Sequence, residues 1–456
     1  MITGSANAYE AKGQLRVHPT NPRYFTDDSG EVIYLTGSHM WNNLIDMGKD
    51  DPPQPFDFKG YLDFLQRYGH NFIRLWTWDS VTLDTRASSP SLQKDFVHNA
   101  APRPWARTGS GNALDGKPKF DLTKFNPDYF ERLRKRVMAA GERRIYVSIM
   151  LFEGWGLYHA NRRSRVPEDW AWKSHPFHPG NNVNGIGADL GGDGGRPKVH
   201  TLTNPEATAI QEAYIKKVVD TVNDLDNVLY EVINEGGDKD WDWWVVNTIH
   251  DYEKTKPKQH PVGITGHGAE KLPSMLASPA DWISPGRNDG YGEEPPAWNG
   301  EKISLMDTDH VWGVGGNHAW VWKCFVRGHN TLFMDPYDGE VLGKRSDPKF
   351  ELLRFNLGYA MRYAKKMNMA EMIPSNNLAS TQYCLANPDK EYLVYLPDGD
   401  KATVDLSRAT GSFAVEWFSP RAGTTTDGGT SAGGSKVEFI VPFDGDAVLY
   451  LLLNQP

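Results

Sequence analysis

The stretch from Val228 to Gly237 reads V-L-Y-E-V-I-N-E-G-G, a short apolar run that ends in an Asn-Glu pair. Its length, its β-branched residues and the closing glycines predict a buried strand. A helix is expected directly before it, capped by Asn204 and running to about Leu225. Seven similar runs share the first 370 residues with such helices: Val32 to His39, Asn71 to Trp78, Ile145 to Trp155, Pro261 to Gly268, Trp282 to Arg287, Ile303 to His310 and Thr331 to Tyr337.

Eight strands that alternate with helices or long loops predict a parallel sheet closed into a (β/α)₈ barrel. A doubly wound nucleotide-binding sheet is disfavoured because no G-x-G-x-x-G fingerprint follows the first strand. Two long polar loops, about Asp79 to Phe125 and Gly156 to Thr203, follow the second and third strands. Such a barrel builds its active-site rim there, so we expect a catalytic barrel over residues 1–370.

The pattern changes after about residue 370, where short runs of period two replace the helical segments. Turns such as Pro397 to Asp400 and Thr426 to Gly429 are expected to separate them. Short strands at this spacing predict a β-sandwich over residues 371–456. Carboxylates and histidines do not cluster at its turns, so we expect no catalytic group there.

Composition excludes several classes of protein. The 456 residues carry 49 basic and 58 acidic side chains, a mild and evenly spread net charge of −9 that argues against a nucleic-acid surface. No apolar run approaches the roughly 18–20 residues of a membrane span. Cys324 and Cys384 are too few for a disulfide framework or a paired-cysteine zinc site. The first residues lack a secretory signal, so we expect a secreted or periplasmic protein if one was removed and a cytoplasmic protein otherwise.

Aromatic residues are abundant, with 16 Trp, 19 Tyr and 19 Phe. Tryptophan spread over loop-like segments is typical of proteins that stack on sugar rings, although a large fold also uses tryptophan to fill its core.

Side chains at the carboxyl ends of barrel strands are the candidates for chemistry. Glu153 is as readily a loop-bracing residue as a sugar ligand, Asp335 can cap a turn, and the histidines can be structural. The set comprises His39, Trp41, Arg74, Trp76, Trp78, Glu153, Trp155, Asn234, Glu235, His267, Asp307, Asp309, His310 and Asp335.

The strand that ends in Asn234-Glu235 resembles the fourth strand of clan A glycoside hydrolases, whose Asn-Glu pair supplies the general acid/base. Arg74, in N-F-I-R-L-W, matches the arginine that orients the nucleophile of those enzymes. The resemblance implies that Glu235 is the acid/base. It also implies cleavage of an O-glycosidic bond in an oligo- or polysaccharide, with no cofactor and no metal.

The tail carries the more specific resemblance. Its segments Y-L-V-Y-L-P-D-G, V-E-W-F-S-P-R and V-P-F-D-G-D-A-V-L-Y-L resemble the sandwich named collagen-binding that follows the barrel in several bacterial glycosidases, including the apiosidase-like group. Nothing in this sequence indicates collagen binding itself.

One departure from the clan concerns the seventh strand, where a nucleophilic Glu is usual. Here Ile303 to Met306 leads to Asp307, followed by Thr308 and Asp309. Asp307 occupies the nucleophile position, and Asp309 is the alternative because it shares a face with Asp307 nearer the rim. The shorter Asp side chain retracts the carboxylate by roughly 1.5 Å, toward the spacing of inverting enzymes. We nevertheless expect retention of anomeric configuration, because Arg74 and Asn234 match the residues around an attacking carboxylate.

Four alternatives stay open. The Arg–Asp–Glu group can be a buried network that braces the barrel, or the barrel can be inactive and bind glycans through its Trp-rich loops. The segment D-T-D-H-V from Asp307 also fits the Mg²⁺-dependent haloacid-dehalogenase-like phosphatases, although that motif belongs at the start of a doubly wound domain. A divalent cation on Asp307, Asp309 and His310 is disfavoured because His is an uncommon ligand for hard cations.

Overall fold

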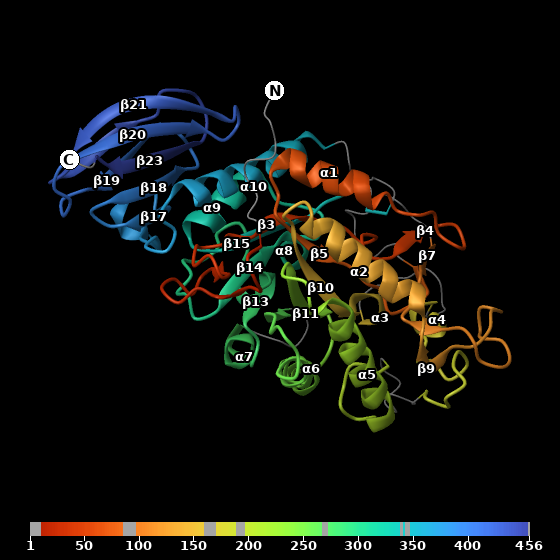
Figure 1. Cartoon of the computed structure of the whole chain (residues 1–456). Coiled ribbons are helices and arrows are strands. Elements are labelled where there is room, and N and C mark those ends of the chain that lie inside the picture. Colours follow the sequence, from red (N-terminus) through yellow and green to blue (C-terminus); the bar gives the residue numbers. More distant parts are fainter. Residues whose placement is uncertain are drawn as a thin grey trace.

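The computed structural model describes residues 11–84, 97–158, 170–187, 197–266, 272–337, 341–342 and 347–454. Eight parallel strands form one sheet in the order β3-β15-β14-β13-β12-β11-β10-β5, as a barrel requires (Figure 1). Each lies within one of the eight predicted runs or begins one residue before it, so the predicted (β/α)₈ barrel is confirmed. The strands are β3 (Thr36–His39), β5 (Phe72–Leu75), β10 (Tyr146–Glu153), β11 (Val228–Asn234), β12 (Val262–Thr265), β13 (Trp282–Ser284), β14 (Ile303–Asp307) and β15 (Asn330–Met334).

The barrel closes where β3 meets β5. The backbone N–H of Asn71 donates to the carbonyl of Thr36 at 3.0 Å, and the Asn71 side chain accepts from the Thr36 N–H at 2.9 Å. A Cβ added to Gly37 would lie 2.1 Å from the carbonyl oxygen of Phe72. Glycine at this position therefore permits the close approach of the two strands that closure needs.

The barrel interior is layered from apolar to polar. Phe72, Leu229 and Leu305 belong to an apolar cluster that fills the amino-terminal end. Residues two positions further along a strand face the same side, and here they are Arg74, Glu231 and Asp307. The carboxyl end of the barrel is consequently polar, and its charges sit above an apolar floor.

Helices surround the sheet on the outside (Figure 1). Asn204 caps one of them as predicted, since its side chain accepts from Glu206 and Ala207, and Gly69, with φ 73°, ends the first long helix. They are α1 (Phe58–Tyr68), α2 (Pro127–Gly141), α5 (Pro205–Val222), α6 (Lys239–Glu253), α7 (Leu272–Ala277), the short α8 (Thr308–Val311), α9 (His318–Val326) and α10 (Pro348–Lys366).

The two long segments after the second and third barrel strands contain short elements of their own. After β5 come β6 (Thr82–Asp84), β7 (Val97–Ala101), β8 (Trp105–Ala106) and β9 (Asp121–Phe125). β7 pairs with β6 and with β4 (Asp46–Gly48), while β8 pairs with β9. After β10 come α3 (Trp155–Tyr158) and α4 (Trp170–Ser174).

The predicted C-terminal β-sandwich is also confirmed. One sheet has the order β16-β17-β18-β23-β20-β21, the second consists of β19 and β22, and apolar residues such as Val394, Val404 and Leu449 fill the space between them. The strands are β16 (Ile373–Pro374), β17 (Cys384–Asn387), β18 (Glu391–Leu396), β19 (Lys401–Asp405), β20 (Ser412–Ser419), β21 (Thr424–Ala432), β22 (Lys436–Ile440) and β23 (Ala447–Leu453).

The turn predicted at Thr426 to Gly429 is wrong, because these residues lie inside β21. β21 pairs with β20 on both sides of the glycines, and the register shifts between Ala414 and Glu416. Gly429 has φ 74°. The Gly-Gly pair therefore forms an irregularity within the strand, which a single sequence does not distinguish from a turn.

The sandwich packs on the barrel through α9 and α10 (Figure 1). The ring of Trp322 on α9 lies 5.8 Å from that of Phe418 on β20. On α10, Tyr363 donates to Glu416 at 2.8 Å, and Asn356 donates to the carbonyl of Pro420 at 3.0 Å. The barrel and the sandwich consequently share a continuous apolar core.

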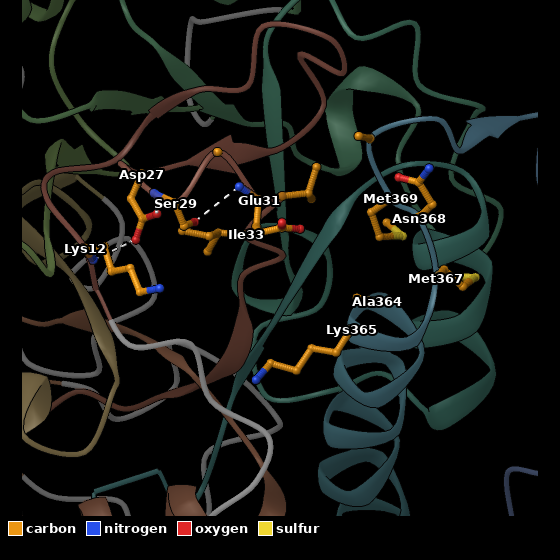
Figure 2. Close-up of a pocket in the computed structure, with 13 residues that line it drawn as sticks. Lys12, Asp27, Ser29, Glu31, Ile33, Ala364, Lys365, Met367, Asn368 and Met369 are labelled. Atoms are coloured by element: carbon orange, nitrogen blue, oxygen red, sulfur yellow. Dashed lines mark hydrogen bonds between the residues drawn. The ribbon is translucent and has the colours of Figure 1, made fainter.

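A cavity of about 470 Å³ lies near the amino ends of the barrel strands, between the Asp27–Ile33 segment and the end of α10 (Figure 2). Its Asp27 side chain accepts from the backbone N–H of Lys12 at 2.7 Å. None of the predicted site residues lines it. Catalysis in such barrels occurs at the opposite end, so this cavity is not the candidate site.

No helix in the described part of the chain is long and apolar enough to span a membrane.

Candidate functional site

Arg74 is the centre of a buried charged cluster at the carboxyl end of the barrel. Its Nε and Nη2 donate to the two oxygens of Glu231 at 2.8 and 2.5 Å. Nη1 donates to Asp307 at 2.9 Å and to Asp309 at 3.1 Å, and Nη2 also donates to the Asn234 amide oxygen at 2.8 Å. Burial alone would lower the pKa of Arg74, but the facing carboxylates raise it above its usual value. The guanidinium is therefore a fixed positive charge shared by β11 and β14.

Asp307 is saturated with hydrogen bonds. One oxygen accepts from His39 Nε2 at 3.0 Å and from the backbone N–H of Asp309 at 2.9 Å. The other lies 2.8 Å from His39 Nε2 and 2.9 Å from Arg74. Burial opposes its ionisation, yet His39 and Arg74 hold the pKa of Asp307 well below its usual range. Since its side chain is fully buried, Asp307 is an ionised carboxylate enclosed by protein.

Asp309 lies two residues beyond the strand, in the first turn of α8, and its side chain is 7% exposed. Burial raises the pKa of Asp309 to about 6, with Arg74 lowering it and Asp307 raising it. This carboxyl group reaches the surface of the site and changes its charge near neutral pH.

Glu235 follows β11 directly and has a left-handed backbone conformation, with φ 51°. This conformation is uncommon for a residue with a side chain, and such residues cluster at functional sites. Burial, and after it the charge of Asp309, holds the pKa of Glu235 well above its usual range. Glu235 is therefore the carboxyl group of the cluster whose surroundings favour the protonated form, whereas the lowered pKa of Asp307 favours its ionised form.

His310 and Asn234 link β11, β13 and α8. His310 lies 2.8 Å from the Ser284 hydroxyl through Nδ1 and 3.3 Å from the Asn234 amide oxygen through Nε2. Both side chains are buried, so they hold the polar layer together around Arg74.

Glu153, at the end of β10, accepts the backbone N–H of Gly156 with both oxygens, at 3.0 and 3.1 Å. This contact is the loop-bracing alternative of the sequence analysis. Burial and the charge of Asp79 raise the pKa of Glu153 well above its usual range. Asp79 in turn accepts from His200 at 2.9 Å and from the backbone N–H of Glu153 at 3.2 Å.

Four predicted tryptophans lie next to one another beside this cluster. Trp76 stacks on His39 with ring centroids 5.6 Å apart, and the Arg74 guanidinium lies 5.0 Å from its ring. The ring centroids of Trp41 and Trp155 are 5.1 Å apart, and Trp78 donates to the carbonyl of Trp41 at 2.9 Å. Trp41, Trp76 and Trp78 are buried, whereas Trp155 is half-buried. Trp155 is the member of the group most available to a ligand.

Two predicted residues stand apart from the cluster. Asp335 is held by Arg354 of α10 through two contacts of 2.8 and 2.5 Å, so it forms a buried ion pair. His267 lies outside the described residues.

Glu231 and the Asp79–His200 pair also belong to this network, but they are not among the predicted site residues. Glu231 lies two residues after Leu229, inside an apolar run, and a charged residue in such a buried run is the available signal. Among the described residues, no group of three or more His, Cys, Asp or Glu side chains is arranged to hold a metal ion. Cys324 and Cys384 are buried free thiols.

The phosphatase alternative requires a doubly wound domain, and the barrel contradicts this alternative. Asp307 and Asp309 lie at the end of its seventh strand, β14.

Comparison with known proteins adds two family matches. Residues 101–268 match a family described as a domain of unknown function (DUF6298), and residues 369–451 match the "Putative collagen-binding domain of a collagenase". The second match confirms the resemblance of the tail. No curated protein sequence matches this chain.

Solved structures with the same architecture are glycoside hydrolases. A glycoside hydrolase family 5 protein from Bacteroides vulgatus ATCC 8482 superimposes with a TM-score of 0.61 at 14% identity, over 98% of this chain and 95% of that one. A structure described as "a putative glycoside hydrolase" from the same strain gives a TM-score of 0.62 at 13% identity, over 97% of this chain and 82% of that one. The chain thus has the fold of family 5 glycoside hydrolases of clan A, and the predicted fold resemblance is confirmed.

Proposed function

We propose that this protein is a glycoside hydrolase in which Glu235 is the general acid/base and Asp309 is the second carboxylate. The observation that carries the proposal is the difference in surroundings between two carboxyl groups of one cluster, Glu235 and Asp309. Burial and the charge of Asp309 raise the pKa of Glu235 well above its usual range, whereas Arg74 donates to Asp309 and opposes the rise that burial causes in the pKa of that group. Hydrolysis of a glycosidic bond needs this contrast, because one carboxyl group must donate a proton and the other must be ionised.

Glu235 would donate its proton to the oxygen of the leaving group. The leaving group carries this proton away, and Glu235 becomes the base for the attacking water in the second step of a retaining reaction. Among the neighbouring charges, Asp309 raises the pKa of Glu235 most, and a bond between Asp309 and the sugar would remove that charge. The pKa of Glu235 would then fall, as its change from acid to base requires.

The contacts favour Asp309 over Asp307 as the second carboxylate, which reverses the preference drawn from sequence. Both oxygens of Asp307 are occupied by His39, Arg74 and a backbone N–H, and its side chain is fully buried. A nucleophile or base must reach the sugar, and the partly exposed Asp309 is the better placed of the two. Asp307 would then act as a positioning residue that fixes Arg74 and the start of α8.

Retention of configuration is the stereochemical outcome that we propose. Retaining enzymes hold their two carboxyl groups about 5–5.5 Å apart, and inverting enzymes hold them about 6.5–9.5 Å apart. Asp309 begins two residues beyond the strand end, so its position on the rim offsets the methylene that Asp lacks relative to Glu. Arg74 lowers the pKa of Asp309 against the effect of burial, and at a pKa of about 6 this carboxylate would be mostly ionised at neutral pH for attack on the anomeric carbon.

The substrate would be an oligo- or polysaccharide. Trp155 and the neighbouring tryptophans provide apolar ring faces next to the charged cluster, as expected of a site that stacks on sugars.

A panel of aryl glycosides and oligosaccharides, tested with the full chain, would identify the sugar. Glu235→Gln should lower turnover of a substrate with a poor leaving group by roughly 10²–10⁴-fold, the usual effect of general acid–base catalysis. Turnover within a few-fold of the parent would contradict the assignment of Glu235. Sugar binding without turnover by the parent would instead identify an inactive glycan-binding barrel. Proton NMR of the first-formed anomer tests stereochemistry, and an initial product of inverted configuration would make Asp309 a base toward water.

A further inference from the structure

Arg103 is a buried arginine whose binding edge has no partner. It lies in the insertion after β5, two residues beyond β7, and is 5% exposed. Its Nη1 donates to the carbonyl of Ser80 at 3.1 Å. Its Nε and Nη2 are buried and have no hydrogen-bond partner within the described residues. Such unsatisfied donors on a buried charge are costly, which indicates that a partner is missing.

The same edge binds a carboxylate in two other arginines of this chain. Nε and Nη2 of Arg74 donate to the two oxygens of Glu231, and Nε and Nη2 of Arg354 donate to the two oxygens of Asp335. Nε–H and one N–H of Nη2 point the same way and match the two oxygens of a carboxylate. In Arg103 the same edge is buried, but no carboxylate of the described residues meets it.

Arg103 lines a cavity of about 310 Å³, at the lower end of the sizes of ligand pockets. Trp105, Phe120, Pro53 and Pro102 give it apolar walls. The indole Nε1 of Trp105 is a second buried donor that has no partner in the described part of the chain. Arg103 and Trp105 therefore both line this apolar pocket, and both carry buried donors that no described residue accepts from.

Within the described part of the chain, Arg103 is the basic residue of this lining that makes no ion pair, and the nearby charge of Asp79 acts on it without a direct contact. The other two basic residues of the lining are paired, Arg107 with Asp115 at 2.5 Å and Lys117 with Asp51 at 2.5 Å. Burial lowers the pKa of Arg103 to about 10, whereas Arg74 and Arg354, which face carboxylates, have raised pKa values. Arg103 is therefore still charged at neutral pH, and an anion would neutralise it.

The pocket belongs to the rim of the barrel. Its walls come from the insertion after β5 and from the loop that follows β4, both of which continue from carboxyl ends of barrel strands. Ser80, which accepts from Arg103, follows Asp79, and Asp79 accepts from the N–H of Glu153 beside the active site. Ser80 and Asp79 therefore connect this pocket to the charged cluster of the candidate site.

We propose that this pocket binds the carboxylate of an acidic sugar through the Nε–Nη2 edge of Arg103, with Trp105 as a second donor. That a sugar carries the carboxylate rests on the proposed function, but binding of a carboxylate does not. A neutral sugar would leave the Arg103 charge buried and unpaired, so the pocket should discriminate between a uronic acid and the corresponding neutral hexose.

Calorimetric titration of the full chain with D-glucuronate, D-galacturonate, D-glucose, D-galactose and acetate tests the proposal. At least one uronate should bind, and neither hexose should bind at the same concentration. Arg103→Lys keeps the charge but removes the forked edge, and should weaken uronate binding by about 10–100-fold. Trp105→Phe keeps the ring and removes the Nε1 donor, so it should weaken binding less and provides a milder second variant.

Two control variants test whether the effect is specific to Arg103. Arg107→Lys makes the same change in a lining residue whose donors are already used, so uronate binding should stay within a few-fold. Glu235→Gln should also leave uronate binding unchanged, which distinguishes failure of this proposal from failure of the proposed glycosidase activity. Equal losses in Arg103→Lys and Arg107→Lys, or no uronate binding by the parent, would overturn the site. Acetate binding as tightly as the uronates would overturn the sugar as its ligand.

Discussion

Replacing Asp307 and Asp309 one at a time by asparagine should separate a structural carboxylate from a reacting one. The two residues are two positions apart and both contact Nη1 of Arg74, so the same change is made at the same guanidinium. They differ in exposure, because Asp307 is enclosed while Asp309 is 7% exposed. They also differ in the hydrogen-bonding groups that would surround an asparagine side chain at each position.

The expected effect on stability is large for Asp307→Asn. Its two oxygens meet His39, Arg74 and the Asp309 N–H, so an amide NH₂ would confront donors on either side. Loss of one partner from a buried ion pair costs about 3–5 kcal/mol. Asp309→Asn removes one contact to an arginine that still faces Glu231 and Asp307, and we expect a loss of about 1 kcal/mol or less.

For turnover the order of the two variants is reversed, and Asp309→Asn should have the larger effect. Asp309→Asn removes the proposed nucleophile and should lower the turnover of a folded protein by roughly 10³-fold or more. Thermal unfolding and initial rates on the same preparations measure both quantities, with circular dichroism to establish that each variant is folded. An Asp309→Asn variant with near-parent turnover, next to an Asp307→Asn variant that is stable and inactive, would refute the reasoning.

Three further predictions concern pH, barrel closure and the sandwich. Turnover should fall as the pH drops through about 6, because burial raises the pKa of Asp309 to about 6 and the reaction needs its ionised form. A pH–rate profile whose acid limb lies near pH 4 would contradict this. Gly37→Ala should destabilise the barrel by about 3 kcal/mol or more, since its Cβ would meet the Phe72 carbonyl at 2.1 Å. Gly292→Ala, which meets nothing within 4 Å, is the matched control, and equal unfolding midpoints would argue against the closure contact. A chain that stops at Asn368 should lose stability and aggregate, because it exposes the sandwich-facing side chains of Trp322 and Tyr363. If that chain instead stayed folded by circular dichroism but lost all turnover, the sandwich would have to contribute to the site.

Local signals determined much of the architecture. The apolar runs that end in polar residues predict all eight barrel strands, and Asn204 marks the start of a helix as the cap in the structure does. These features depend on neighbours within a few residues, so a sequence contains them directly. The Gly-Gly pair at 428–429 shows the limit of such reasoning, because a glycine pair permits a bulge within a strand as well as a turn.

Within the site, the sequence determined which residues stand at strand ends, and it brought Arg74, Asn234, Glu235, Asp307 and Asp309 into one group. It did not reveal Glu231, because a single acidic residue in an apolar run has no partner until another strand approaches. The choice between Asp307 and Asp309 likewise depends on His39, which the chain places 268 residues before Asp307.

Tertiary structure alone decided the charge states and the partners. A carboxyl group's pKa depends on how much water and which charges surround it, and closure of the barrel sets both by bringing β3, β5, β11 and β14 together. The same holds for Arg103, which looks like any loop arginine in the sequence. No acceptor among the described residues reaches its Nε–Nη2 edge, and this is a property of the folded chain because every potential partner must first be placed in space.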